Sequence, residues 1–126
     1  MKIVVSSSGK DLDSQIDPRF GRCAYFVIVN TDDMSFETFE NESTALGGGA
    51  GIQAAQFVTS KETQVVVTGN VGPNAVRALS AAGVEVITGQ TDTVRKAVED
   101  YKMGKLTGVN EADVSKHHGM GRRREK

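Results

Sequence analysis

The chain lacks the sequence features that are typical of disulfide-rich, secreted and membrane proteins. Its 126 residues include a single cysteine, which rules out an internal disulfide framework and favours a cytoplasmic setting. The first residues, MKIVVSSSGK, hold too short an apolar stretch for a signal peptide. No apolar run approaches the roughly 20 residues that a membrane span needs. We therefore expect a cytoplasmic protein with no membrane segment.

The chain also has no large excess of positive or negative charge. The formal net charge is −1 at pH 7, so the body of the chain has no overall field that would attract nucleic acid. The segment 116–126 is the exception, because it carries five Lys or Arg and one Glu, a formal charge of +4. We expect residues 108–126 to form a disordered tail, since they lack hydrophobic periodicity. Its basic residues give only a weak, salt-sensitive attraction, so we expect neither nucleic acid nor a membrane as a partner.

Histidine occurs only twice, as His117 and His118 in the tail. A nucleophilic cysteine needs a general base nearby, so we do not expect a Cys–His dyad. One adjacent pair does not make a closed zinc site, which needs four ligands, and the two histidines are weak metal candidates. The strand-like runs KIVVS and QVVVTG carry no acid, whereas a two-metal nuclease needs carboxylates from several elements. We therefore expect no enzyme activity.

The sequence does contain a regular alternation of strand-like and helical patterns. Short β-branched or alternating runs predict five strands, at residues 2–6, 24–30, 35–40, 64–69 and 84–88. Apolar residues at helical spacing predict three helices, from Gly51, from Pro73 to Gly83, and from an N-cap at Thr91 or Asp92 to Gly104. Strands joined through helices should be parallel, and the hairpin of the second and third strands adds an antiparallel part. The pattern predicts an α/β fold with a mixed five-stranded sheet and three helices packed on it, in one domain over residues 1–107.

Four polar segments that contain glycine lie between or at the ends of these elements, at residues 6–9, 49–54, 68–75 and 88–91. Ligands of open α/β sheets bind at the carboxyl ends of the strands, so we expect these segments to line one edge. A helix that starts in glycines offers bare N–H groups and its positive dipole end to an anion. The alternative is that the segments are tight turns that need small residues.

The second of these segments, GAGIQA, fits the dinucleotide pattern G-x-G-x-x-G/A. It does not follow a strand directly, and the position where an acid would bind the ribose is Asn70. The chain also has no GKS or GKT with which to build a nucleotide phosphate loop. We therefore expect no nucleotide cofactor.

The single thiol, Cys23, follows Arg19 and Arg22 in the stretch IDPRFGRC and precedes an apolar strand-like run. Neighbouring arginines favour the thiolate, which is the form that ligates metal, provided that the side chain is partly exposed. The alternative is a small apolar residue at the start of a strand.

Four segments together resemble one known family. They are DPRFGRCAYFVIV, GGGAGIQAAQFV, TGNVGPNAVRALSAAGVEVI and TVRKAVEDYKMGKL, and the similarity covers residues 1–107. In content and order they are similar to the dinitrogenase iron–molybdenum cofactor biosynthesis family. Its patterns D-x-R-F-G-R, G-A-G-I-Q-A-A and G-N-x-G-P-N-A are occupied by residues 17–22, 49–55 and 69–75.

The resemblance implies a ribonuclease H-like α/β fold without nuclease activity, in small proteins that bind, carry or store metal–sulfur clusters. Such clusters include precursors of the iron–molybdenum cofactor, and relatives called orange proteins hold a mixed molybdenum–copper sulfide cluster. It implies a nitrogen-fixation-related carrier of a labile cluster, with donor and acceptor proteins as partners. We expect a monomer or a weak dimer. Several relatives carry a histidine just before the glycine helix, where this chain has Ala45, Leu46, Gly47 and Gly48.

An anionic cluster needs cations and N–H donors more than many covalent ligands. We expect Arg19 and Arg22 to supply charge and the two glycine-rich helix starts to supply N–H groups. The expected cofactor-binding residues are Arg19, Arg22, Gly48, Gly49, Ala50, Gly51, Asn70, Gly72 and Asn74. Cys23 is a candidate metal ligand.

Two other functions stay open. The first is a metal-free interaction or regulatory module that binds a protein partner or an anionic small molecule. The second is a small enzyme that acts on a nucleotide or a phosphorylated substrate. Colour in protein purified without oxygen would separate the cluster carrier from both.

Overall fold

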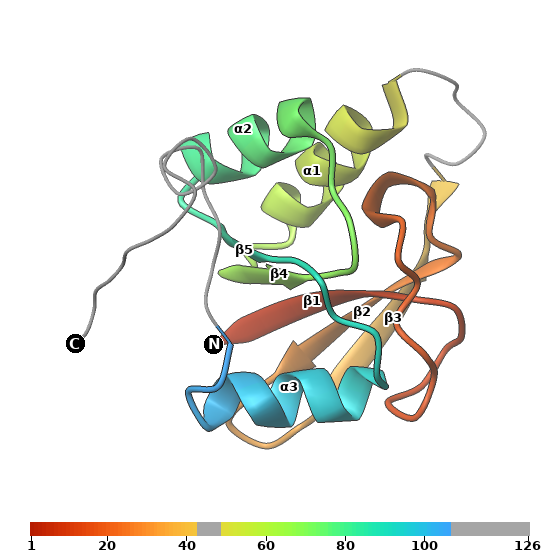
Figure 1. Cartoon of the computed structure of the whole chain (residues 1–126), viewed down its shortest axis with the longest axis vertical. Coiled ribbons are helices and arrows are strands. Elements are labelled where there is room, and N and C mark those ends of the chain that lie inside the picture. Colours follow the sequence, from red (N-terminus) through yellow and green to blue (C-terminus); the bar gives the residue numbers. More distant parts are fainter. Residues whose placement is uncertain (43–48, 107–126) are drawn as a thin grey trace.

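The β-branched runs of the sequence lie side by side in one sheet, as the computed structural model of residues 1–42 and 49–106 shows (Figure 1). These residues form five strands and three α-helices. The strands are β1 (Lys2–Ser7), β2 (Tyr25–Asn30), β3 (Phe36–Glu40), β4 (Val65–Val67) and β5 (Glu85–Ile87). The helices are α1 (Ala50–Ser60), α2 (Pro73–Ala81) and α3 (Val94–Lys102), and a 3-10 turn, η1 (Phe20–Arg22), precedes β2.

The strands are arranged in the order β3-β2-β1-β4-β5. β2 runs antiparallel to β1 and β3, whereas β1, β4 and β5 are parallel to one another. In the central strand, Ile3 lies opposite Val29 on one side and Val65 on the other. The prediction of an α/β fold with a mixed five-stranded sheet and three helices is confirmed.

Helices cover both faces of the sheet, α1 and α2 on one face and α3 on the other (Figure 1). Val4 belongs to the core beneath α1 and α2 and clusters with Leu79 of α2. Val5 points to the opposite face and clusters with Val98 of α3. Because both faces are buried, β1 and β4 are continuous apolar runs and do not alternate with polar residues.

The structure corrects the predicted start of α3. Its N-cap is Thr93, not Thr91 or Asp92, because Thr93 Oγ1 accepts a hydrogen bond from the backbone N–H of Lys96 at 3.2 Å. The Asp92 carboxylate accepts instead from the backbone N–H of Thr93, at 2.8 Å. β4 and β5 are also shorter than the predicted runs, at three residues each.

The segment between β1 and β2 connects the two helical layers. Its first part packs on α3, where the backbone N–H groups of Val94 and Arg95 donate to the carbonyls of Ser14 and Leu12 at 3.0 and 2.8 Å. Its second part forms η1 and lies against α1. The segment therefore fixes η1 relative to both faces of the sheet.

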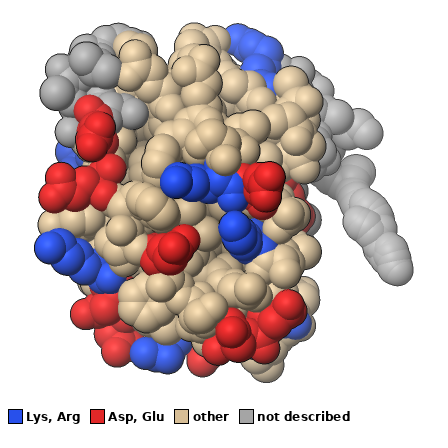
Figure 2. Space-filling view, turned by 180° about the vertical axis from the view of Figure 1, so that it is seen from behind, with Lys and Arg blue, Asp and Glu red and all other residues tan. Residues whose placement is uncertain are grey.

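The surface shows no broad area of one charge on the face drawn in Figure 2, where positive and negative side chains are interspersed. None of the helices that the structure describes is both long and apolar enough to span a membrane. The segment predicted to be a disordered tail, residues 108–126, lies outside the described residues.

Candidate functional site

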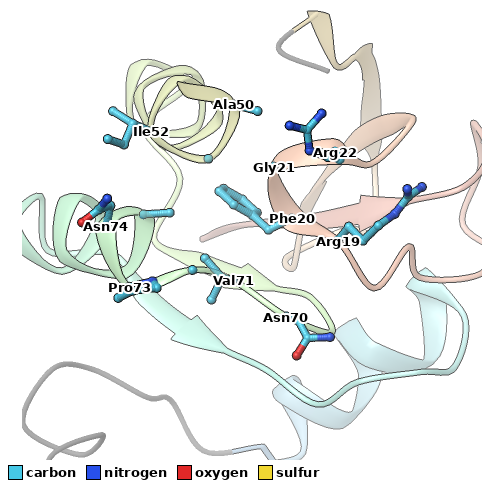
Figure 3. Close-up of a pocket in the computed structure, with 13 residues that line it drawn as sticks. Arg19, Phe20, Gly21, Arg22, Ala50, Ile52, Asn70, Val71, Pro73 and Asn74 are labelled. Atoms are coloured by element: carbon cyan, nitrogen blue, oxygen red, sulfur yellow. The ribbon is translucent and has the colours of Figure 1, made fainter. Parts of the chain in front are cut away.

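A pocket of about 500 Å³ opens where η1 meets the first turns of α1 and α2 (Figure 3). Its lining comes from three segments that are distant in the sequence, residues 19–22, 50–52 and 70–75. They include most of the predicted cofactor-binding residues, namely Arg19, Arg22, Ala50, Gly51, Asn70, Gly72 and Asn74. The fold therefore brings the DPRFGR motif and both glycine-rich helix starts to one place.

A pair of backbone hydrogen bonds ties the arginine segment to the β4–α2 connection. Asn70 donates its backbone N–H to the carbonyl of Pro18 at 2.6 Å, and Phe20 donates to the carbonyl of Asn70 at 3.1 Å. This contact is close because of Gly69, at which a Cβ atom would lie 2.7 Å from Pro18 Cα. A side chain at position 69 would therefore push the two segments apart.

A second contact places η1 directly against the start of α1. A Cβ atom at Gly21 would lie 2.9 Å from both the Cα and the backbone nitrogen of Gly51. The buried Asn41, which follows β3, holds η1 from the other side, because its Nδ2 donates to the carbonyls of Gly21 and Cys23 at 3.2 and 3.0 Å. Backbone packing and one amide side chain thus fix the turn that carries the arginines.

Arg19 is held by the buried carboxylate of Asp17. Asp17 Oδ1 accepts hydrogen bonds from the backbone N–H and from Nε of Arg19, at 3.0 and 3.3 Å. The Arg19 side chain is 65% exposed, whereas that of Asp17 is only 8% exposed. In Figure 3 the Arg19 guanidinium extends away from α2, so the pocket receives mainly the base of this side chain.

Arg22 has different surroundings. Figure 3 shows its guanidinium beside the start of α1, near Ala50. The side chain is exposed and lies on the same side of the pocket as Arg19. Arg22 is therefore the better placed of the two cations to meet an anion at this helix end.

The two helices that border the pocket begin without side-chain caps. Gly49 is the N-cap of α1 and Gly72 that of α2, and neither helix has an acidic residue in its first turn. The start of α3 is different, because there the first N–H groups are bonded to Ser14, Leu12 and Thr93. The pocket thus faces two positive helix ends that no described side chain neutralises.

The remaining lining is apolar. The Phe20 ring, which is 1% exposed, points into the space between α1 and α2 and forms the inner wall (Figure 3). Ile52 and Val71 add aliphatic surface, and no carboxylate lies among the described residues that line the pocket. The site therefore combines an apolar wall with cations and N–H donors at its rim.

Cys23 does not match the expectation of an exposed thiolate. The residue is fully buried, its Sγ donates to the carbonyl of Phe20 at 3.4 Å, and it belongs to the core under α1 and α2. Burial, and then the charge of Asp17, raise the pKa of the Cys23 thiol to about 12. The neighbouring arginines point to solvent and do not offset the loss of hydration, so the thiol stays protonated at neutral pH.

The other predicted site residues divide into two groups. Gly49 caps α1 but does not line the pocket. Gly48, His117 and His118 lie outside the described residues. In the part of the chain that the structure describes, no three His, Cys, Asp or Glu side chains are grouped so that they could hold a metal ion.

Two of the four segments expected at one edge do not line the pocket. In the first, the Ser6 hydroxyl is buried against Thr68 Oγ1 at 2.7 Å, and Gly9 folds back onto Ser14. The segment 88–91 leads toward α3, on the opposite face. The four segments therefore do not line one common site, and only the segments at the starts of α1 and α2 line the pocket.

Two residues at or near the pocket lie where neither apolar spacing nor the sequence motifs would place them. Ile52 belongs to a helix that apolar spacing predicts, but its side chain is 41% exposed, because it lies in the first turn of α1, at the pocket. Arg77 of α2 lies outside the motif residues, although its Nη2 donates to Asn74 Oδ1 at 2.7 Å. The i, i+3 spacing of Asn74 and Arg77 on one helix is the signal that could have found this pair.

Two solved structures, from Desulfovibrio gigas and Thermotoga, are similar to this protein. The apo form of the orange protein from Desulfovibrio gigas is 42% identical, with a TM-score of 0.83, over 86% of this chain and 92% of that one. A putative NifB protein from Thermotoga is 36% identical, with a TM-score of 0.74, over 85% of this chain and 91% of that one. Both resemble this protein over nearly their whole length.

Sequence comparison agrees with these structures. An uncharacterized protein of Methanocaldococcus jannaschii is 27% identical over 97 residues, which are 75% of this chain and 82% of that protein. A family model described as dinitrogenase iron–molybdenum cofactor matches residues 1–104. That match spans almost all of the described residues and confirms the resemblance seen in the motifs. The chain belongs to the dinitrogenase iron–molybdenum cofactor family.

Proposed function

We propose that this protein binds and carries an anionic metal–sulfur cluster, without catalysing a reaction, in the pocket between η1 and the first turns of α1 and α2. Membership of the family gives a cofactor-associated role. The observation that carries the proposal is the meeting of two uncapped helix N-termini and the Arg22 side chain in one pocket, with the base of Arg19 at its edge. Such an arrangement stabilises negative charge through N–H donors, helix dipoles and cations.

The chemistry of the pocket suits a large sulfide cluster better than a small oxyanion. Phosphate and sulfate are strongly hydrated, and an apolar wall such as Phe20 and Val71 would not replace their water. A metal–sulfur cluster is larger and more polarisable, so it can rest on an apolar wall while its charge meets the rim. The described lining offers Arg22 and backbone N–H groups but no thiolate or imidazole. These residues would hold the cluster without covalent bonds and allow its release.

Release fits a carrier that exchanges its cargo with other proteins. We propose cluster donor and acceptor proteins as partners, a cytoplasmic location and a monomer or weak dimer. The cargo would be a precursor of the iron–molybdenum cofactor or a molybdenum-containing sulfide cluster, which relates the protein to nitrogen fixation. The antiparallel β2 in an otherwise parallel sheet supports the ribonuclease H-like fold that the resemblance implies.

The direct test is a titration of the metal-free protein with tetrathiomolybdate, without oxygen, followed by visible absorption and by isothermal calorimetry. We expect saturable binding that phosphate and sulfate at equal ionic strength do not displace. Arg22→Met should weaken binding, whereas Lys105→Met, which removes one charge beyond α3 on the opposite face, should not. Binding of phosphate with no binding of the thiomolybdate would contradict the proposal and favour a metal-free module for an anionic small molecule.

A further inference from the structure

Arg77 lies one helical turn after Asn74 and fixes the orientation of an amide at the rim of the pocket. Its Nη2 donates to Asn74 Oδ1 at 2.7 Å, and both residues are exposed on α2. A guanidinium has only N–H donors, so the end of the amide that faces it must be the oxygen. The NH₂ end of Asn74 is consequently turned the other way.

Asn74 itself belongs to the pocket lining, in the first turn of α2. Figure 3 shows its nitrogen on the side of Ile52 and its oxygen on the opposite side. With its oxygen bonded to Arg77, this side chain offers the pocket two N–H donors and no acceptor. A freely rotating amide would present its oxygen part of the time, and an oxygen repels an anion.

We propose that Arg77 is a positioning residue for anion recognition: it holds Asn74 as a pure donor at the rim. This inference rests on the proposed function, because it assigns a specificity determinant to the same pocket. Arg77 is not part of the lining. Its effect is therefore exerted through Asn74, with a smaller contribution from its own charge, which salt screens.

The proposal predicts coupling between the two side chains. Arg77→Met should weaken tetrathiomolybdate binding about three- to tenfold, the usual value of one well-placed hydrogen bond. The same substitution made in an Asn74→Ala protein should change the affinity less than about twofold, because the amide is already gone. Arg77→Lys, which can still donate to Asn74 Oδ1, should recover part of the affinity, and Lys105→Met serves as the charge control.

A second measurement does not need a bound cluster. In the ligand-free protein, Arg77→Met should shift the ¹³C resonance of the Asn74 side-chain carbonyl and increase the motion of its NH₂ group, whereas Lys105→Met should change neither. Unchanged NMR parameters of Asn74 would overturn the inference, whatever the protein binds.

The two sets of data separate this inference from the proposed function. If the wild-type protein binds no thiomolybdate, the proposed function fails, and the NMR measurement alone decides whether Arg77 positions Asn74. If the wild type binds and Arg77→Met weakens binding equally with and without Asn74, Arg77 acts only as a charge and the positioning role is wrong.

Discussion

Arg19 and Arg22 lie in the same turn but meet different surroundings. Asp17 already accepts two hydrogen bonds from Arg19, and the Arg19 guanidinium extends away from α2. Arg22 lies beside the start of α1. Two arginines that are alike in the sequence are therefore unequal in the site, because their side chains point in different directions.

We expect Arg22→Met to weaken tetrathiomolybdate binding about fivefold or more, and Arg19→Met about twofold, at low ionic strength. The reason is placement, because the Arg22 guanidinium lies beside the start of α1 and the Arg19 guanidinium extends away from α2. Dissociation constants from anaerobic calorimetry, with Lys105→Met as the matched control, would measure the difference. A larger loss for Arg19 than for Arg22 would contradict the placement of the two side chains.

Cys23 gives a prediction about pH. Since burial raises the pKa of its thiol to about 12, the native protein should react with iodoacetamide far more slowly than the urea-unfolded chain at about pH 8. The folded state retains this proton to higher pH than the unfolded state, in which the thiol has its ordinary pKa of 9.0. The free energy of unfolding should therefore be unaffected by Cys23 below pH 9.0 and fall as the pH rises toward about 12.

Two variants test whether these effects come from the buried thiol of Cys23. Cys23→Ser retains a small side chain but should remove the alkylation signal and reduce the alkaline loss of stability. Asn41→Ala, which removes the amide that bonds the Cys23 carbonyl, should instead speed alkylation of the native protein. Equal reaction rates for native and unfolded wild-type chains would show that the thiol is accessible.

At the scale of elements, the pocket depends on how closely η1 approaches α1 and the β4–α2 connection. Sequence periodicity predicted the five strands and three helices because apolar spacing reports which face of an element is buried. It could not predict that Gly21 lies against Gly51, or that Gly69 lies against Pro18, since these contacts join segments far apart in the chain. Gly21 and Gly69 were not among the predicted cofactor-binding residues, and the structure shows that backbone packing requires a glycine at both positions.

Substitution by alanine should change the free energy of unfolding in different ways at Gly21 and at Gly51. Gly21→Ala places a Cβ atom 2.9 Å from the backbone of Gly51 and should lower the free energy of unfolding by about 1–3 kcal/mol. Gly51→Ala adds a methyl group at an ordinary 3.6 Å from Ala75 Cβ, within a helix, and should be neutral or stabilising by up to about 1 kcal/mol. Urea denaturation of both variants would test this, and a neutral Gly21→Ala would show that η1 does not pack against α1 as described.

On the scale of the whole molecule, two helical layers and the β1–β2 segment hold the site at one end of the sheet. The sequence predicted most of the lining, because the motifs DPRFGR, GAGIQAA and GNVGPNA include it. It could not predict that segments 6–9 and 88–91 are diverted, since this depends on where the β1–β2 segment packs against α3. The exposure of Ile52 likewise follows from the position of α1 relative to η1 and not from its apolar spacing.

The extent of the domain gives a further prediction. The described core ends with Leu106, which packs against the cluster that includes Val98. We expect a chain that ends at residue 107 to keep its free energy of unfolding within about 0.5 kcal/mol of the full-length value. Thermal and urea denaturation of the shortened chain would measure this. Loss of cooperative unfolding would mean that residues 108–126 belong to the domain.

Cluster binding is tested most directly by metal and sulfide analysis, with an absorption spectrum, of protein purified without oxygen from its native host. We expect stoichiometric molybdenum or iron together with sulfide, and visible bands that are lost in an Arg19→Met, Arg22→Met double variant of equal stability. A colourless, metal-free protein that also fails to take up thiomolybdate or synthetic iron–sulfur clusters would contradict it, and would leave family membership without a cluster-carrying function.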